Sequence, residues 1–107
     1  MWDTKYSDYK ITAEDCPYHT NHYADICAHL FESFRKRDLG VIAYFSKADW
    51  HVDSYWSENY ERGSYQHRGP SYDPKEYPEE WERFVNFTQN QIMELGSRYG
   101  QIDGMWF

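Results

Sequence analysis

The chain has 107 residues, with 11 Lys and Arg against 18 Asp and Glu, so its formal net charge is −7. This length suits one small domain, and the acidic balance argues against nucleic acid or an anionic membrane as a partner, because both bind basic surfaces. Phe, Trp and Tyr make up 21% of the residues, which suits either sugar recognition or a tyrosine-rich loop surface without a ligand.

The first predicted element is a helix that follows a polar, aromatic loop over residues 1–21. Thr20 or Asn21 can cap it. Apolar residues then recur at helical spacing, at Ile26, Cys27, Leu30, Phe31 and Phe34. The basic run Arg35-Lys36-Arg37 suits the negative end of the helix dipole, and Leu39-Gly40 is expected to close the helix.

The apolar run Val41–Ser46 is predicted to be a buried strand. In a barrel, alternate side chains of a strand point inward and the others pack on the helices. The set that suits the helix side is wholly apolar and consists of Val41, Ala43 and Phe45. Tyr44 and Ser46 are then inward, near the C-terminal end of the strand.

A stretch rich in Tyr, Ser, Asp, Gly and Pro covers residues 47–75. Loops of that length in a compact domain are usually functional or disordered. Asp49-Trp50-His51 lies just past the inward end of the first strand, and a carboxylate, an indole and an imidazole suit a sugar there. A loop anchored by a buried Trp50 explains the same residues equally well, so both interpretations stand.

Pro78 and the acidic pair Glu79-Glu80 begin a second predicted helix. Its apolar face comprises Trp81, Phe84, Val85, Thr88, Ile92 and Leu95, and its acidic residues are expected to be solvated. The run Ile102–Phe107 is predicted to be a second buried strand. Its alternation directs Met105 and Phe107 toward the helices, and Ile102, Gly104 and Trp106 inward.

The order helix–strand–long loop–helix–strand predicts an α/β fold with a parallel sheet. Two strands cannot close a barrel or cover both faces of a sheet, so the rest of the sheet is expected to lie outside this chain. Chemistry in barrels of parallel strands lies at the C-terminal ends of the strands. Asp103 lies at the start of its strand with the wrong alternation, and we expect a structural role for it.

Metal binding has one candidate motif, Cys16, His19 and His22. Zinc needs three or four ligands, and no convincing fourth is adjacent, so we expect no metal and no other cofactor. Two cysteines do not make a disulfide framework, and Cys27 is expected to be a buried thiol. The longest apolar runs are far shorter than the roughly 20 residues that span a bilayer, so we expect no membrane partner.

Several segments, in order along nearly the whole chain, resemble the α-L-fucosidases of glycoside hydrolase family 29. The first and last are the most specific. The segments are Trp2-Asp3-Thr4-Lys5-Tyr6-Ser7-Asp8-Tyr9, Arg35-Lys36-Arg37, Ala43-Tyr44-Phe45-Ser46 with Asp49-Trp50-His51, and Arg98-Tyr99-Gly100 through Trp106-Phe107.

This resemblance implies that residues 1–107 are the central fragment of a glycoside hydrolase catalytic barrel, a partial (β/α)8, TIM-like barrel that is truncated at both ends. It also implies a retaining mechanism, in which one carboxylate is the nucleophile and a second is the acid/base. Trp106 and Phe107 match the two positions before the family's nucleophilic Asp. The nucleophile is therefore expected immediately after Phe107, and the acid/base further downstream. Tyr44 matches an active-site tyrosine and Trp106 an active-site tryptophan. Many members have Tyr-Tyr-Ser where this chain has Tyr44-Phe45-Ser46.

The expected function is that of a retaining α-L-fucosidase, which releases terminal L-fucose from fucosylated oligosaccharides or glycoconjugates. The substrate-binding residues are expected to be Tyr44, Trp106, Trp50 and His51, and none of the 107 residues is expected to be catalytic. The alternative is a non-catalytic carbohydrate-binding relative of the same barrel. A weaker third hypothesis is a metal-dependent barrel hydrolase that uses the Cys-His-His motif. A secreted, periplasmic or lysosomal location is the expectation for the full-length enzyme.

Overall fold

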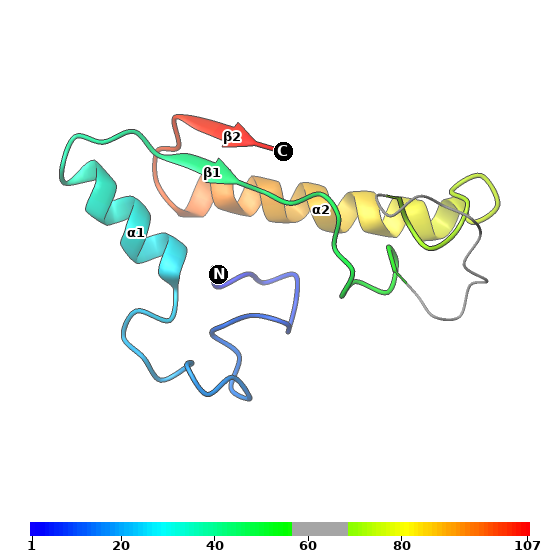
Figure 1. Cartoon of the computed structure of the whole chain (residues 1–107), viewed down its shortest axis with the longest axis horizontal. Coiled ribbons are helices and arrows are strands. Elements are labelled where there is room, and N and C mark those ends of the chain that lie inside the picture. The colour runs from blue at the N-terminus through cyan, green and yellow to red at the C-terminus, as the bar shows by residue number, and fades with distance from the viewer. Residues whose placement is uncertain (57–68) are drawn as a thin grey trace. The chain divides into compact units, whose positions relative to one another are not determined.

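The computed structural model of the chain describes residues 1–56 and 69–107 (Figure 1). In these residues two helices and two short strands follow one another. They are α1 (Ile26–Arg35), β1 (Ile42–Tyr44), α2 (Pro78–Arg98) and β2 (Gly104–Trp106). The chain divides into two compact units, one of Met1–Phe45 with Asn90–Trp106 and one of Ser46–Gln89 with Phe107.

Helix α1 begins after Asp25, whose Oδ1 accepts a hydrogen bond from the backbone N–H of Ala28 at 3.0 Å. The prediction that Thr20 or Asn21 caps this helix was wrong. Both residues lie in turns before it, and Asn21 Oδ1 accepts instead from the backbone N–H of Tyr23 at 2.8 Å. A short polar side chain that closes a local turn in this way is no longer free to cap a helix.

The end of α1 also lies earlier than predicted. The helix stops at Arg35, and Asp38 adopts a left-handed conformation with φ 55°. The backbone N–H of Leu39 then donates to the carbonyl oxygen of Phe34 at 3.0 Å. This left-handed residue ends the helix before the chain reaches Leu39-Gly40.

Strands β1 and β2 pair in parallel, with Ile42 opposite Gly104, Ala43 opposite Met105 and Tyr44 opposite Trp106. Helix α2 connects them, so the α/β class and the parallel sheet are confirmed. Both strands are shorter than the apolar runs that predicted them. Backbone hydrogen bonds continue past them at each end, from Asp103 N to Val41 O at 2.8 Å and from Phe45 N to Trp106 O at 2.9 Å.

The core of the first unit consists of Phe31, Val41, Ala43, Phe45, Leu95 and Tyr99. Its members confirm the predicted alternation of β1, because Val41, Ala43 and Phe45 are buried whereas Ile42 and Tyr44 are 68% and 69% exposed.

The second strand follows its predicted alternation less closely. Met105 packs against the core as expected, and Trp106 is 69% exposed on the other side. Ile102 was predicted to face inward, but it packs against the same core, because it precedes β2 and does not share the alternation of the strand. Phe107, expected to face the helices, is 52% exposed.

The second unit packs around the first half of α2. The helix begins at Pro78 with Glu79 and Glu80 in its first turn, as predicted. Phe84 is buried, and its ring centroid lies 4.4 Å from that of Tyr55, which is also buried. The hydroxyl of Tyr72 donates to the carbonyl oxygen of Ser54 at 2.6 Å. Two tyrosines of the described loop residues are therefore anchored in this unit.

Candidate functional site

The outer face of the two-stranded sheet carries an aromatic pair, Tyr44 and Trp106. They are register partners in β1 and β2, and directly opposite residues of neighbouring strands project to the same face of a sheet. Each is 69% exposed. We call Tyr44 and Trp106 the aromatic platform. The structure brings together these two predicted substrate-binding residues, which lie far apart in the sequence.

The platform has a packed layer behind it. Phe45 follows Tyr44 with its side chain in the core, and its backbone N–H donates to the carbonyl oxygen of Trp106 at 2.9 Å. The ring of Trp2 lies against the ring of Phe45, with centroids 6.1 Å apart. Phe45 thus contacts both Trp2, which belongs to the N-terminal segment of residues 1–5, and the end of β2.

The exposed side chains of this face combine apolar rings with polar edges. An aromatic ring can stack on the C–H face of a sugar, while a phenol and an indole N–H can hydrogen-bond to its hydroxyls. The strand residues of this face are Ile42, Tyr44, Gly104 and Trp106, and these four include no carboxylate. The platform can therefore hold a sugar ring but supplies no acid, base or nucleophile of its own.

Trp50 and His51, the other predicted substrate-binding residues, belong to the second unit. Trp50 is 64% exposed, and its ring lies edge-on to that of Trp56 with centroids 6.5 Å apart. The interpretation of this loop as one anchored by a buried Trp50 was therefore wrong. The backbone N–H of His51 donates to Asp49 Oδ1 at 3.0 Å, so Asp49 closes a local turn.

Asp103 has the structural role that was expected. Its Oδ2 accepts a hydrogen bond from the backbone N–H of Val41 at 2.7 Å, and Gln101 Nε2 donates to its Oδ1 at 3.3 Å. The backbone N–H of Asp103 in turn donates to the carbonyl oxygen of Val41. Asp103 thus joins the two segments of the chain at the point where β1 and β2 begin.

The metal-binding motif does not form a cluster. His19 Nδ1 lies 2.7 Å from the carbonyl oxygen of Cys16, whereas the ring of His22 packs against those of Tyr23 and His29. Within residues 1–56 and 69–107, no group of three or more His, Cys, Asp or Glu side chains could hold a metal ion.

Cys27, predicted to be a buried thiol, is partly buried against the core. Burial raises the pKa of this thiol above its ordinary value. The thiolate is the reactive form of cysteine, so this environment disfavours reactivity at Cys27.

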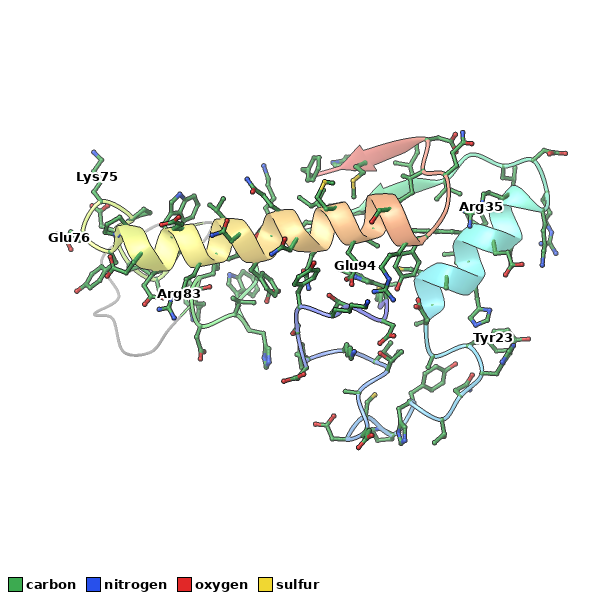
Figure 2. All side chains as sticks on the ribbon, turned by 180° about the vertical axis from the view of Figure 1, so that it is seen from behind. Tyr23, Arg35, Lys75, Glu76, Arg83 and Glu94 are labelled. Carbon is green, nitrogen blue, oxygen red and sulfur yellow. The ribbon has the colours of Figure 1, made fainter. Side chains whose placement is uncertain are left out.

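Sequence reasoning missed the role of Glu94. It was expected to be solvated with the other acidic residues of α2, but its side chain is only 2% exposed. Figure 2 shows it on the C-terminal part of α2, on the side of the N-terminal segment. A signal was present, because Gln91, Glu94 and Arg98 recur at helical spacing beside the apolar face.

The protonation of Glu94 follows from its partners. Burial raises the pKa of a carboxyl group, but hydrogen bonds from Thr4, Trp2, Lys5 and Arg98 together outweigh it and lower the pKa of Glu94 below its ordinary value. Glu94 is therefore a buried carboxylate at neutral pH.

A second polar contact holds the N-terminal segment near α1. The hydroxyl of Tyr99 donates to Asp25 Oδ2 at 2.8 Å and accepts from the backbone N–H of Asp3 at 3.0 Å. Burial, and then the neighbouring Asp25 carboxylate, raise the pKa of Tyr99 strongly. Asp25 thus caps α1 and receives the Tyr99 hydroxyl at the same time.

Comparison with known proteins gives one match. A family model described as alpha-L-fucosidase matches residues 1–107, the whole chain. No curated protein and no solved structure matches the chain. Neither of the helices in the described ranges is long and apolar enough to cross a membrane.

Proposed function

The chain belongs to the α-L-fucosidase family, and from this we propose that it forms part of a retaining α-L-fucosidase that releases terminal L-fucose from fucosylated glycans. The observation that carries the proposal is the pairing of Tyr44 with Trp106 on the outer face of the sheet. The family match makes the substrate class a fucoside, and the platform offers a surface on which a sugar ring can stack.

We propose that β1 and β2 are neighbouring strands of a (β/α)8 barrel, of which residues 1–107 are a central part. Two facts support this. The two strands are parallel and joined through α2, as in a barrel. One face of the sheet packs on the core, while the other leaves Ile42, Tyr44 and Trp106 about two-thirds exposed. Further strands of a barrel would cover such a face.

In this proposal Tyr44 and Trp106 lie inside the barrel and bind L-fucose. L-Fucose has an apolar edge that includes its methyl group, which suits the ring faces, and hydroxyls that suit the polar edges of the two side chains. Trp50 and His51 are further candidates for substrate binding, because their loop follows β1 in the sequence. Loops after the C-terminal ends of barrel strands form the active sites of such enzymes.

The nucleophile is proposed at the position that follows Phe107. Side chains alternate along a strand, so the position two residues after Trp106 shares its inward direction. A carboxylate there would attack the anomeric carbon while the acid/base, further downstream, protonates the departing oxygen. Water would then release fucose from the covalent intermediate. Residues 1–107 alone are proposed to bind the sugar without hydrolysing it.

A carbohydrate-binding relative without activity is the second candidate. It has support in the aromatic pair Tyr44 and Trp106, since two exposed rings on one face suit the binding of a sugar whether or not a nucleophile follows. The codon after that of Phe107 separates the two, because an acidic residue supports the enzyme and any other residue supports the binding protein.

The direct assay uses the natural protein as its gene encodes it. We expect hydrolysis of an aryl α-L-fucoside, with the α-anomer of fucose as the first product in NMR spectra, and no hydrolysis of an aryl α-L-rhamnoside as the matched control. Fucose binding without turnover would instead identify the binding relative. A protein that neither binds nor hydrolyses fucosides would refute both candidates.

A further inference from the structure

Glu94 is the buried charged residue of residues 1–56 and 69–107. A buried charge is costly unless it is paired and hydrogen-bonded, and an apolar residue could fill the same space at less cost. This carboxylate is well satisfied. Its Oε2 accepts from Trp2 Nε1 at 2.9 Å, and its Oε1 accepts from Lys5 N at 3.0 Å and Arg98 Nη1 at 2.6 Å.

The donors to Glu94 come from two parts of the chain. Arg98 is one helical turn further along α2, whereas Trp2 and Lys5 belong to the N-terminal segment. The bond to Trp2 fixes the edge of its indole ring, and the bond to Lys5 fixes the backbone three residues later. Glu94 therefore determines both the position and the rotation of the Trp2 ring.

The Trp2 ring in turn supports the aromatic platform. It packs against Phe45 with centroids 6.1 Å apart. Phe45 is bonded covalently to Tyr44 and donates its backbone N–H to the carbonyl oxygen of Trp106 at 2.9 Å. A displaced Trp2 ring would leave a gap behind Phe45, and closely packed interiors transmit such changes to their neighbours.

We propose that Glu94 is a positioning residue that orients Tyr44 and Trp106 through Trp2 and Phe45. The inference rests on the proposed function, because it assigns Glu94 a part in sugar binding at the same platform. Glu94 itself does not touch the substrate in this proposal. It acts through the hydrogen bond to the Trp2 indole, while Arg98 Nη1 donates to its other carboxylate oxygen.

A glutamine cannot replace Glu94 in this role. The side-chain amide has one acceptor oxygen and one NH2 donor, while each carboxylate oxygen of Glu94 receives at least one N–H. In Glu94→Gln, either the Trp2 indole or the Lys5 backbone must face a donor. The substitution changes the hydrogen bonds and barely changes the volume, so it tests orientation rather than packing.

The test uses the natural protein and compares Glu94→Gln with Glu82→Gln, an exposed glutamate of the same helix. Trp2→Phe keeps an aromatic ring beside Phe45 and removes the N–H together with the five-membered ring. The assay uses an aryl α-L-fucoside at a temperature below the melting temperature of every variant. We expect Glu94→Gln and Trp2→Phe each to raise KM about tenfold, with kcat less affected. The double variant should be no worse than the worse single one, since both act on one contact.

The indole N–H signals of Trp2 and Trp106, assigned by substitution to phenylalanine, give a second readout that needs no turnover. Both signals should shift in Glu94→Gln and neither in Glu82→Gln. A folded Glu94→Gln protein with unchanged KM would overturn the proposal if Trp106→Ala raises KM. If the natural protein hydrolyses no fucoside, the proposed function fails, and the NMR signals still test the role of Glu94. A shift of the Trp2 signal without a shift of the Trp106 signal in Glu94→Gln overturns that role. If Glu94→Gln does not fold, Trp2→Phe decides by KM and by the indole N–H signal of Trp106.

Discussion

Replacement of Trp106 by alanine separates binding from stability at the aromatic platform. The side chain is 69% exposed in this chain, so the packing of the described residues depends little on it. If the Trp106 ring stacks on fucose, its removal should instead weaken the binding of the transition state. Aromatic contacts of this kind contribute about 1–3 kcal/mol, so kcat/KM should fall by about 5- to 150-fold.

The matched control for this variant is Ile42→Ala. Ile42 lies on the same face and is 68% exposed, but it comes two residues before Tyr44, roughly 7 Å further from the C-terminal ends of the strands. Its loss should leave kcat/KM for an aryl α-L-fucoside nearly unchanged.

Urea unfolding of both proteins would complete the comparison. The reasoning is refuted if Trp106→Ala keeps full kcat/KM. It is also refuted if Ile42→Ala and Trp106→Ala reduce activity equally, because the face would then be packing surface rather than a sugar site.

Three predictions concern stability and use urea unfolding of the natural protein. Asp103→Asn replaces the charged acceptor of the Val41 N–H by a neutral one and should reduce the free energy of unfolding by about 1 kcal/mol; an unchanged midpoint would contradict the role of Asp103 where the strands begin. Gly100→Ala should cost about 1–2 kcal/mol, because Gly100 has φ 75° and a Cβ there would lie 3.0 Å from the guanidinium of Arg35; equal stability would show that the backbone relaxes. The pKa of Glu94 is lowered in the folded protein, so its ionised form stabilises the fold fully above the ordinary pKa of about 4.3, and this stabilisation is lost as the pH falls through the lowered pKa. The difference in the free energy of unfolding between the natural protein and Glu94→Gln should therefore be constant above about pH 5 and decrease in acid. A difference that increases in acid would show that the pKa of Glu94 is raised instead.

Side-chain alternation was the part of the structure that the sequence predicted best. Val41, Ala43 and Phe45 are apolar and every second residue, so the buried face of β1 could be read directly, and Tyr44 followed on the other face. The same rule failed for Ile102, which precedes the paired part of β2. Alternation holds only where the backbone is extended and paired, and a sequence does not show where pairing begins.

Polar contacts between distant segments were the part that could not be predicted. Glu94 is of the same residue type as the exposed Glu79 and Glu82 of the same helix. It is buried because Trp2 and Lys5, at the other end of the chain, pack against it. The capping of α1 by Asp25 was missed for a similar reason. Thr20, Asn21 and Asp25 can all cap a helix, and the turns that occupy the earlier two became visible only in the structure.

The hydrogen bond between Trp2 and Glu94 has a consequence for how the protein is made. The two residues are 92 positions apart, and Asp3 is 96 positions from its partner Tyr99. At a synthesis rate of about 5–20 residues per second, Glu94 and Tyr99 leave the ribosome roughly 5–20 seconds after the N-terminal segment. During that time the Trp2 indole cannot donate its hydrogen bond to Glu94, and chaperones or other nascent chains can contact it. Contacts of such high sequence separation also close slowly, so the docking of the first five residues should be among the last events of folding.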